Sequence, residues 1–275
     1  MRAPGPTLFA LLGSPVSHSL SPRLHRRAFR SLGRDACYAA LEVDGEEVPA
    51  VMRALARSGG GGNVTLPHKE RAARAVEAPT RAVLATGACN TFWRDGEGRL
   101  AGDNTDVAGF REATGELLDG DEPLADRAVL LLGAGGAARA VAHACLEGGA
   151  ASVDVLNRTP ERAHELAARF ADARLRVLAD RGEARPGYDL AVNATSLGLS
   201  PDDPLPLELD AVDLGAVHDL VYGDDGTAWT VRARELGIPA LDGREMLARQ
   251  AAAALGRWFC EAPPLAVLRR ALAEA

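Results

Sequence analysis

Short apolar runs alternate with amphipathic stretches along the first hundred residues of the chain. The apolar runs have the length and composition of buried strands, and the amphipathic stretches have the 3.6-residue period of helices. The predicted strands lie at 7–12, 38–43 and 63–67 and as a pair around the turn at 95–98, and the predicted helices lie at 24–33, 48–57 and 69–77. This alternation predicts an α/β unit.

A second series of alternating elements begins near residue 107. Its predicted elements are a helix at 107–118, a strand, glycine turn and helix within 128–150, the strand SVDVLNRT, the helix PERAHELAARF, and strands in LRVLA, YDLAVNAT, AVHDLVY and IPALDG. Serial alternation of this kind predicts a twisted parallel sheet with right-handed crossovers. From Arg244 onward the pattern is helical, so we expect two closing helices that return to the first unit.

Composition narrows the class of protein. The chain has 275 residues, 47% of them hydrophobic, which is enough for a substantial core. Its net charge is −7 and no long basic stripe occurs, so we expect no nucleic-acid partner. No apolar run is long enough for a signal peptide or a membrane span, and we expect a cytoplasmic protein.

Cysteine and histidine spacing predicts neither disulfides nor a metal site. Four cysteines lie far apart with no CxxC, and the six histidines form no HExxH or similar pair of ligands. A reducing compartment is therefore expected, and no bound metal.

A glycine turn carries the first candidate chemistry. Gly133, Gly135 and Ala138 form G-x-G-x-x-A between a predicted strand and a helix. The first glycine permits the tight turn, the second lets the backbone approach a pyrophosphate, and the small third residue lets helix and strand pack closely. This setting predicts a dinucleotide site at the helix N-terminus.

The end of the next strand indicates which dinucleotide binds. It carries Asn157, Arg158 and Thr159, with Arg162 following, whereas Asp154 lies too early to bind a ribose 2′-hydroxyl. Two guanidinium groups without a carboxylate suit a 2′-phosphate, so we predict NADP. The alternative is two ordinary surface arginines in an arginine-rich chain.

Pairs of polar residues form the second group of candidates. Ser19 and Ser21 lie two apart, which predicts a hydroxyl cradle for a carboxylate or hydroxyl group. The alternative for Ser21 is an N-cap followed by Pro22 at the first helical position. His18 adjoins Ser19, but adjacent residues rarely orient for nucleophilic attack, so a hydrolase is discounted.

Further polar residues fall in NVT, ACNT and GDNTD. Asn63 and Thr65 repeat the spacing of two, and Asn90 and Thr91 add uncharged hydrogen-bonding groups. Asp106 is a candidate acid–base residue, although it could equally be the cap of the helix that follows.

Lys69 is the one lysine among the 31 Lys and Arg residues of the chain. On composition alone, compositional drift and a chemical requirement for lysine explain this single lysine about equally well. The chemical explanation is that a lysine ammonium can give up a proton, whereas an arginine cannot.

Taken together, these motifs resemble those of the shikimate dehydrogenase family. The matching stretches run in family order from about residue 13 to 251: GSPVSHSLSP, NVTLPHKE, GACNT, GDNTD, LLGAGGAARA, NRTPERA, NATS-LG, DLVY and DGREMLARQA. The resemblance implies NADPH-dependent, reversible reduction of 3-dehydroshikimate to shikimate in aromatic amino acid biosynthesis. It also implies an α/β substrate-binding and catalytic domain, 1–106 plus 243–275, with an inserted Rossmann-like NADP-binding domain, 107–242.

The resemblance also implies roles for individual residues. Lys69 and Asp106 match the catalytic pair beside the C3 oxygen, and Ser19 and Ser21, assisted by Tyr222, match the substrate carboxylate site. The residues matched to the ring hydroxyls are Thr65, Asn90 and Gln250. The residues matched to the cofactor are Gly133, Ala134, Gly135, Gly136 and Ala137 at the phosphates, Asn157, Arg158, Thr159 and Arg162 at the 2′-phosphate, and Gly243.

Two departures from the family pattern occur. After DLVY the chain has GDDGT, with two carboxylates and no proline, so the rigidity and charge of this loop are expected to differ. After GDNTD it has Val107 where the family usually has glycine, and we expect a stiffer hinge there.

Other functions remain open from the sequence. Quinate or an aminoshikimate is an alternative substrate, a non-catalytic NADP-binding sensor is an alternative function, and an unrelated small acid is disfavoured by the full set of motifs. The expected partners are a small-molecule substrate and NADP, with no membrane, in a monomer or homodimer.

Overall fold

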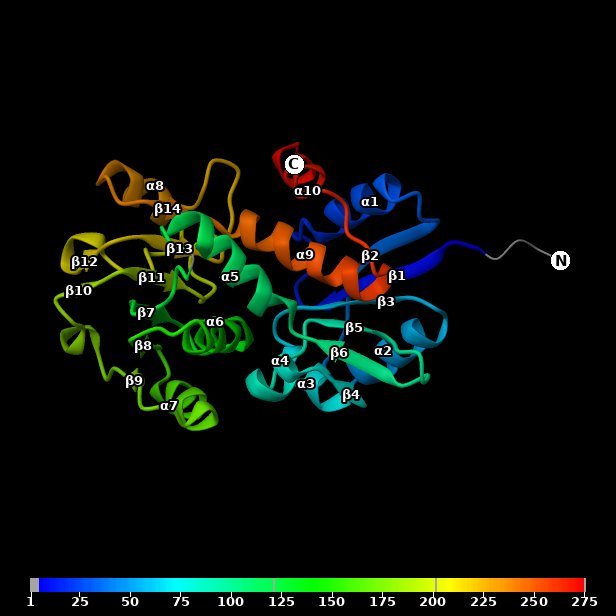
Figure 1. Cartoon of the computed structure of the whole chain (residues 1–275), viewed down its shortest axis with the longest axis horizontal. Coiled ribbons are helices and arrows are strands. Elements are labelled where there is room, and N and C mark those ends of the chain that lie inside the picture. The colour runs from blue at the N-terminus through cyan, green and yellow to red at the C-terminus, as the bar shows by residue number, and fades with distance from the viewer. Residues whose placement is uncertain (1–4, 121, 201, 275) are drawn as a thin grey trace. The chain divides into compact units, whose positions relative to one another are not determined.

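The structure is a computed structural model that describes residues 5–120, 122–200 and 202–274. It has the predicted α/β architecture, with strands and helices alternating along both parts of the chain (Figure 1). Contacts divide it into two compact units, Met1–Thr105 with Leu247–Ala275, and Asp106–Met246. The sequence placed these boundaries at residues 106 and 243; the separate substrate and cofactor roles of the two parts stay a prediction.

The first unit contains a six-stranded sheet in the order β2-β1-β3-β5-β6-β4. The strands are β1 (Thr7–Gly13), β2 (Ala36–Glu42), β3 (Gly61–Val64), β4 (Ala78–Pro79), β5 (Thr91–Arg94) and β6 (Leu100–Asp103). β1 is parallel to β2 and β3, whereas β5 is antiparallel to β3 and β6. The carboxyl ends of β1, β3 and β6 and the amino end of β5 therefore meet at one edge of the sheet.

Helices cover both faces of this sheet (Figure 1). They are α1 (Ser21–Ser31), α2 (Val48–Arg57), α3 (Lys69–Ala75), α4 (Arg81–Thr86), α9 (Gly243–Phe259) and α10 (Leu265–Ala273). Alternation along β1 explains the two cores: Phe9 and Leu11 pack in the core with α1, α9 and α10, whereas Ala10 and Leu12 pack with α2 and α3. The predicted return of the closing helices to the first unit is confirmed.

The second unit contains a six-stranded parallel sheet in the order β14-β13-β11-β7-β8-β9. Its strands are β7 (Ala128–Leu132), β8 (Ser152–Leu156), β9 (Leu175–Val177), β11 (Leu190–Asn193), β13 (Val217–Asp219) and β14 (Ala240–Leu241). Numbered from β7, this is the order 3-2-1-4-5-6 of a dinucleotide-binding sheet, in which ligands bind at the carboxyl ends of the strands.

The helices that precede and connect these strands largely match the sequence pattern. They are α5 (Thr105–Leu117), α6 (Gly136–Glu147), α7 (Pro160–Phe170) and α8 (Ala228–Glu235), with a two-stranded pair of β10 (Gly187–Tyr188) and β12 (Asp213–Leu214) at the side. The sequence prediction missed α8, the short helix α4, and this two-stranded pair.

The predicted strand at 63–67 was wrong in its bounds. The strand expected at 63–67 begins at Gly61 and ends at Val64. Glycines are required here because a Cβ at Gly61 would collide with the Phe92 carbonyl, and one at Gly62 with the Ala10 carbonyl. Neighbouring backbones thus approach too closely for side chains. The run SGGGG therefore has two roles: α2 ends at Arg57 just before it, and its last two glycines begin β3.

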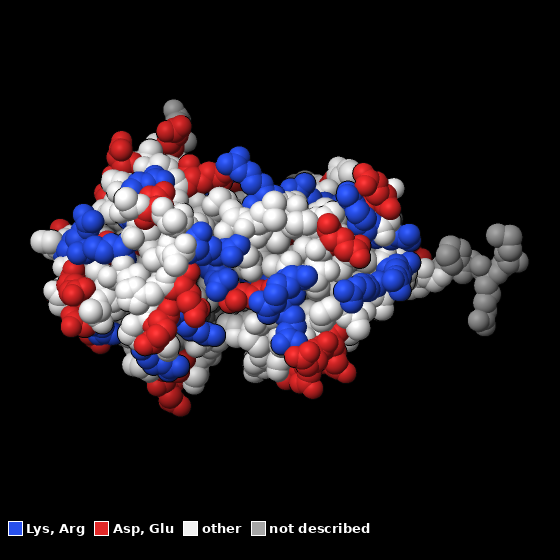
Figure 2. Space-filling model, turned by 90° about the horizontal axis from the view of Figure 1, so that it is seen from below, with Lys and Arg blue, Asp and Glu red and all other residues white. Residues whose placement is uncertain are grey.

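Acidic and basic side chains are interspersed on the surface face drawn in Figure 2. Among the described residues, no helix combines the length and the apolar character needed to cross a membrane.

Candidate active site

The loop after β1 carries the two predicted substrate serines. The Oγ of Ser19 accepts a hydrogen bond from the Ser21 backbone N–H at 3.2 Å. Ser21 is the first residue of α1, whose N-cap is Leu20 and has no side-chain cap bond. The alternative role of Ser21 as a helix-capping residue is therefore wrong, and its side chain is buried at the start of the helix.

The buried imidazole of His25 is hydrogen-bonded to the backbone at the end of this loop. His25 Nδ1 lies 2.9 Å from the Ser21 carbonyl, so this nitrogen is the donor. Burial lowers the pKa of His25 to about 4, although the Ser21 bond opposes the shift, so the ring is neutral near pH 7. The imidazole stacks on the Tyr38 ring at a centroid distance of 4.2 Å.

Tyr38 connects this support to a network of buried amides. Its hydroxyl donates to Asn63 Oδ1 at 2.7 Å, while Asn63 Nδ2 donates to the Asn90 carbonyl at 3.2 Å and to Thr91 Oγ1 at 2.9 Å. Both the oxygen and the nitrogen of the Asn63 amide are thus hydrogen-bonded to protein groups. We infer that it positions Asn90.

The side chain of Asn90 is fixed by donors to its oxygen. Asn90 Oδ1 accepts from the Thr105 N–H at 2.8 Å, from Thr105 Oγ1 at 3.1 Å and from Thr91 Oγ1 at 3.0 Å. Thr105 Oγ1 also lies 3.4 Å from Gln250 Oε1, and its single proton is donated to either Asn90 or Gln250 at one time. The network therefore brings the predicted residues Asn90 and Gln250 together, and it leaves no choice in the orientation of the Asn90 amide.

Lys69 and Thr65 belong to the same edge of the sheet. Thr65 directly follows β3, and its N–H donates to the Leu12 carbonyl at 2.8 Å. Lys69 is the first residue of α3, and its carbonyl accepts from the Cys89 N–H at 2.9 Å, next to Asn90. Asp106 is buried in the first turn of α5, which begins at Thr105, so Asp106 is not the N-cap.

Removing the Tyr38 hydroxyl tests this network. Tyr38→Phe leaves Asn63 Oδ1 buried without its donor, so we expect a loss of about 1–3 kcal/mol in unfolding free energy and a higher KM for the ring substrate. The matched control is Tyr188→Phe, since Tyr188 is also buried and donates to Asp154 at 2.7 Å in the second unit. Thermal melts and steady-state kinetics of both variants separate the two effects. An unchanged KM in Tyr38→Phe would contradict the positioning role.

The glycine turn after β7 has the geometry of a phosphate loop. Gly133 has φ +110, and a Cβ there would lie 2.9 Å from the Ala194 carbonyl group, so only glycine fits. Gly135 is the N-cap of α6 with no side-chain cap, and a Cβ at Gly135 would meet no atom within 4 Å. Open space before uncapped N–H groups fits a pyrophosphate at the start of this helix.

The residues after β8 fit a 2′-phosphate. Asn157 Nδ2 donates to the Thr159 carbonyl at 2.7 Å, which closes the turn into α7. Arg158 and Arg162 are exposed, and neither forms an ion pair with a carboxylate of the described residues. Two unpaired guanidinium groups beside a helix N-terminus favour a dianion.

Asp154, which the sequence placed too early to bind a ribose 2′-hydroxyl, is hydrogen-bonded to protein groups. Arg176 binds it at 2.7 Å, Arg185 at 3.0 Å and the Tyr188 hydroxyl at 2.7 Å. Burial raises the pKa of Asp154, but these three hydrogen bonds outweigh it and the net shift is downward.

A buried carboxylate organises the loops at the carboxyl edge of the second sheet. Asp219 ends β13 and accepts from Thr227 Oγ1 at 2.6 Å, Asn193 Nδ2 at 2.8 Å and the Val221 N–H at 3.0 Å. These three bonds connect Asp219 to the end of β11, to the loop that carries Tyr222, and to the N-cap of α8. Sequence reasoning missed Asp219, although it lies within the DLVY motif.

Burial raises the pKa of Asp219 to about 6, against the three hydrogen bonds that lower it. Between pH 4 and 6 the native state therefore binds more protons than the unfolded state, and the unfolding free energy falls as pH rises. The shift from 3.8 corresponds to about 3 kcal/mol over this window. Asparagine does not titrate, so we expect the unfolding free energy of Asp219→Asn to lack this fall. The difference in unfolding free energy between the wild type and the variant should therefore shrink, in the wild type's disfavour, from pH 4 to 6. Denaturation midpoints of both proteins across the window test this, and a constant difference would contradict it.

The GDDGT loop is held by an arginine. Arg244 Nη1 donates to the Asp224 carbonyl at 2.8 Å, and its Nη2 lies 3.6 Å from the Asp224 carboxylate. The loop is thus restrained by a hydrogen bond from Arg244 to its backbone where the family usually has a proline, whereas the exposed Asp224 carboxylate adds little to this restraint. Gly243 precedes Arg244; a Cβ there would collide with the Leu220 carbonyl, and its N–H donates to the Val221 carbonyl.

Several network residues could not be selected from the sequence. Tyr38 and His25 look like ordinary core residues in a strand and a helix, and only their contacts show their support of Ser21 and Asn63. Thr105 had a weak signal, because it lies between two candidate residues in GDNTD. Among the described residues, no group of three His, Cys, Asp or Glu side chains could hold a metal ion.

A dinucleotide-binding parallel sheet, together with a second α/β unit that presents hydroxyl, amide and amine groups at one sheet edge, defines an NADP-dependent α/β dehydrogenase. Comparison with known proteins agrees. Residues 11–92 match the family model "Shikimate dehydrogenase substrate binding domain", and residues 117–198 match "Shikimate / quinate 5-dehydrogenase". The chain belongs to the shikimate dehydrogenase family.

Individual relatives cover nearly the whole chain. A shikimate dehydrogenase (NADP(+)) of Rubrobacter xylanophilus is 42% identical over 97% of this chain and 95% of its own length. The crystal structure of shikimate 5-dehydrogenase from Thermus thermophilus, in complex with NADP(H) and shikimate, is 38% identical, with a TM-score of 0.83 over 96% of this chain and 97% of that one. The Aquifex aeolicus enzyme structure has a TM-score of 0.87 at 32% identity, covering 97% of both chains.

Proposed function

We propose that this protein catalyses the reversible, NADPH-dependent reduction of 3-dehydroshikimate to shikimate. The observation that carries the proposal is the buried network that fixes the Asn90 amide next to the backbone of Lys69. A fixed amide is suited to binding a polyhydroxylated ring in one orientation, and the backbone of Lys69 is hydrogen-bonded to the residue before Asn90. Membership of the family and the glycine turn support the cofactor assignment.

The ring substrate is bound by polar groups on several elements. Ser19 and Ser21 hold its carboxylate, and Tyr222 assists them. Thr65, Asn90 and Gln250 hydrogen-bond to the ring hydroxyls. Because these contacts fix the ring before reaction, they lower the entropic part of the barrier.

The proton at the C3 oxygen comes from Lys69. NADPH, when bound, supplies the hydride for the ketone carbon. Lys69 donates the proton that the new alkoxide requires and stabilises its developing charge, while Asp106 holds and polarises the ammonium. In the oxidative direction the same residues accept the proton.

The cofactor is held by the glycine turn after β7 and the arginines after β8. The segment Gly133–Ala137 binds the phosphates, and Asn157, Arg158, Thr159 and Arg162 bind the 2′-phosphate. Gly243 lies near the cofactor, where its missing side chain permits the close approach to the Leu220 carbonyl.

Initial rates of NADPH oxidation with 3-dehydroshikimate, 3-dehydroquinate and an amino analogue of 3-dehydroshikimate test the substrate. We expect turnover with the first and little with the others. Preference for 3-dehydroquinate would identify the protein as a quinate dehydrogenase, an activity that the name of the matching family model also includes. NADPH binding without turnover of any ring would favour the sensor alternative.

A further inference from the structure

A hollow of about 440 Å³ lies between α1 and α10 in the first unit. The two helices lie side by side (Figure 1), and their apolar faces pack in one core that includes Leu24 and Leu268. The residues that line the hollow are Arg27, Arg30, Ser31, Ala266, Val267 and Arg270. Those of α1 are in its C-terminal half, whereas Ser21, a proposed substrate residue, begins the helix.

The three arginines of this lining are not neutralised by the protein. Arg27, Arg30 and Arg270 are exposed, and none of their side chains forms an ion pair or hydrogen bond with another described residue. α1 contains four arginines and α10 contains two, yet neither helix contains Asp or Glu. Positive charge is therefore concentrated at this hollow, although the chain as a whole has a net charge of −7.

Helix electrostatics explains only part of this arrangement. Arg30 and Arg270 are in the last turns of their helices, where a positive charge interacts favourably with the helix dipole. Arg27 is in the middle of α1, four residues after Arg23 and three before Arg30, so three like charges are neighbours on one face. Like charges at this spacing weaken a helix. An anion bound in the hollow would remove this repulsion.

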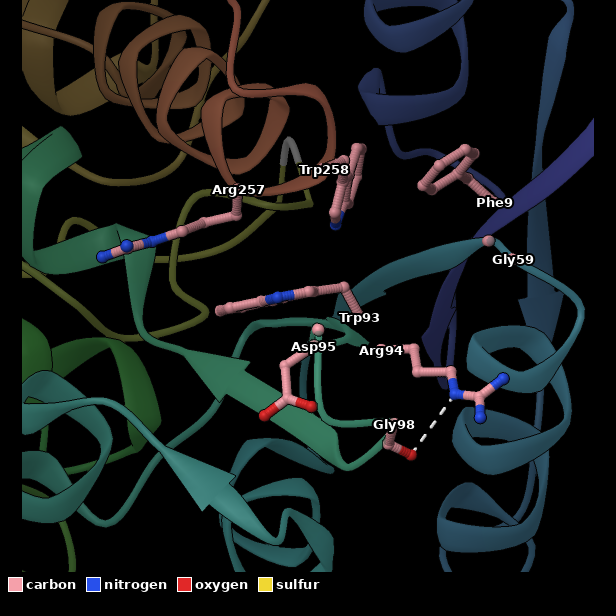
Figure 3. A pocket seen from close by; sticks show the side chains of 10 residues that line it. Phe9, Gly59, Trp93, Arg94, Asp95, Gly98, Arg257 and Trp258 are labelled. Carbon is pink, nitrogen blue, oxygen red and sulfur yellow. Dashed lines mark hydrogen bonds between the residues drawn. The ribbon is translucent and has the colours of Figure 1, made fainter.

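A larger hollow of the first unit, with a volume of about 540 Å³, has no such cluster (Figure 3). It is lined in part by Trp93 and Trp258 and by two arginines. Arg257 is paired with Asp103 at 2.8 Å, and Arg94 directs its guanidinium away from both indole rings. The hollow between α1 and α10 is therefore the better candidate for an anion.

We propose that the hollow between α1 and α10 binds a small organic molecule that carries two phosphate groups. Each guanidinium presents a planar fork of N–H donors that matches phosphate oxygens. A phosphate monoester carries a charge of about −1.5 to −2 at pH 7, so two of them balance three arginines, whereas a single carboxylate does not. Ala266 and Val267 form an apolar part of the wall for the carbon skeleton. The volume lies within the range of small-molecule sites.

Isothermal titration calorimetry of the full chain with fructose 1,6-bisphosphate tests the proposal. An excess of NADP⁺ is present throughout, so that the phosphate-binding groups of the second unit are occupied. We expect saturable binding that Arg27→Gln, Arg30→Gln and Arg270→Gln each weaken about tenfold or more, because each removes a charge-assisted hydrogen bond. Fructose 6-phosphate, which has one phosphate group, should bind about tenfold or more weakly than the bisphosphate for the same reason.

The matched control is Arg26→Gln. Arg26 is also exposed on α1, but it is outside the lining, and its Nη1 donates to the Tyr38 carbonyl at 3.4 Å. This variant removes the same charge from the same helix and should leave the affinity for the bisphosphate unchanged. An equal loss in Arg26→Gln would show that the ligand responds to the overall charge of α1, and it would overturn the proposal.

Other results would also overturn it. Equal affinity of the wild type and all three lining variants would place the ligand elsewhere, and no saturable binding at millimolar probe would exclude the site. Inorganic pyrophosphate that binds as tightly as the bisphosphate would show that the carbon skeleton is not recognised. A single-stranded oligonucleotide that binds more tightly than the bisphosphate, and loses affinity in the same three variants, would assign these arginines to nucleic acid.

Discussion

Lys69→Arg is expected to lower kcat by about 10²–10⁴-fold while the affinity for NADPH stays unchanged. Arginine keeps the positive charge but does not give up a proton at working pH, and its planar fork is wider than an ammonium. Lys69 is half-buried at the first position of α3, where its backbone is tied to Cys89, so the side chain has a fixed origin. Single-turnover kinetics and NADPH fluorescence titration measure the two quantities.

The matched control is Arg71→Lys on the same helix. Arg71 forms an ion pair with Glu46, outside the proposed site. This reverse exchange should leave kcat within about twofold, because surface pairs contribute little. Near-normal turnover of Lys69→Arg would show that Lys69 is not the proton donor, and compositional drift would then explain the single lysine.

The double variant Arg158→Ser with Arg162→Ser is expected to lose about 10²–10⁴-fold in kcat/KM for NADPH, with little change for NADH. Each charge-assisted hydrogen bond to a phosphate contributes about 1.5–3 kcal/mol, and two arginines are removed. Both are exposed and without an ion pair in the described part of the chain, so the fold should tolerate their loss. Steady-state kinetics with each cofactor at saturating ring substrate measure the ratio.

Arg232→Ser provides the control for removing positive charge from this unit. Arg232 lies on α8 and pairs with Glu235 at 3.2 Å. Its loss should change neither cofactor constant. Equal losses for NADPH and NADH in the double variant would show that the arginines do not recognise the 2′-phosphate, and the NADP assignment would then lack its structural basis.

The fold was largely predictable because its strongest signals are local. The glycine turn between β7 and α6 and the amphipathic period of α7 each depend on neighbouring residues. The prediction failed where distant segments decide, as at Gly61 and Gly62, which are in a strand because the Ala10 and Phe92 backbones pass so close. It also missed α8, whose capping box joins Thr227, the last residue of the unusual GDDGT loop, to Thr230.

The candidate site was predictable only as a set of residue types. Asn90 and Gln250 lie far apart in the sequence, and it took the structure to show that Thr105 joins them. The supporting contacts of His25 and Tyr38 depend on the packing of α1 against β2. Such contacts carry no local pattern, since a buried tyrosine in a strand is most often an ordinary core residue.

The most direct test of the central claim is identification of the product from a stoichiometric reaction. Purified protein, one equivalent of NADPH and one of 3-dehydroshikimate are mixed, and nucleotide absorbance is followed while the ring is analysed by NMR. We expect one shikimate to form for each NADPH oxidised, and no product to form in the same time with Lys69→Arg. Unchanged NADPH and ring, with NADPH bound to the protein, would contradict the claim and identify a cofactor-binding protein that does not catalyse this reaction.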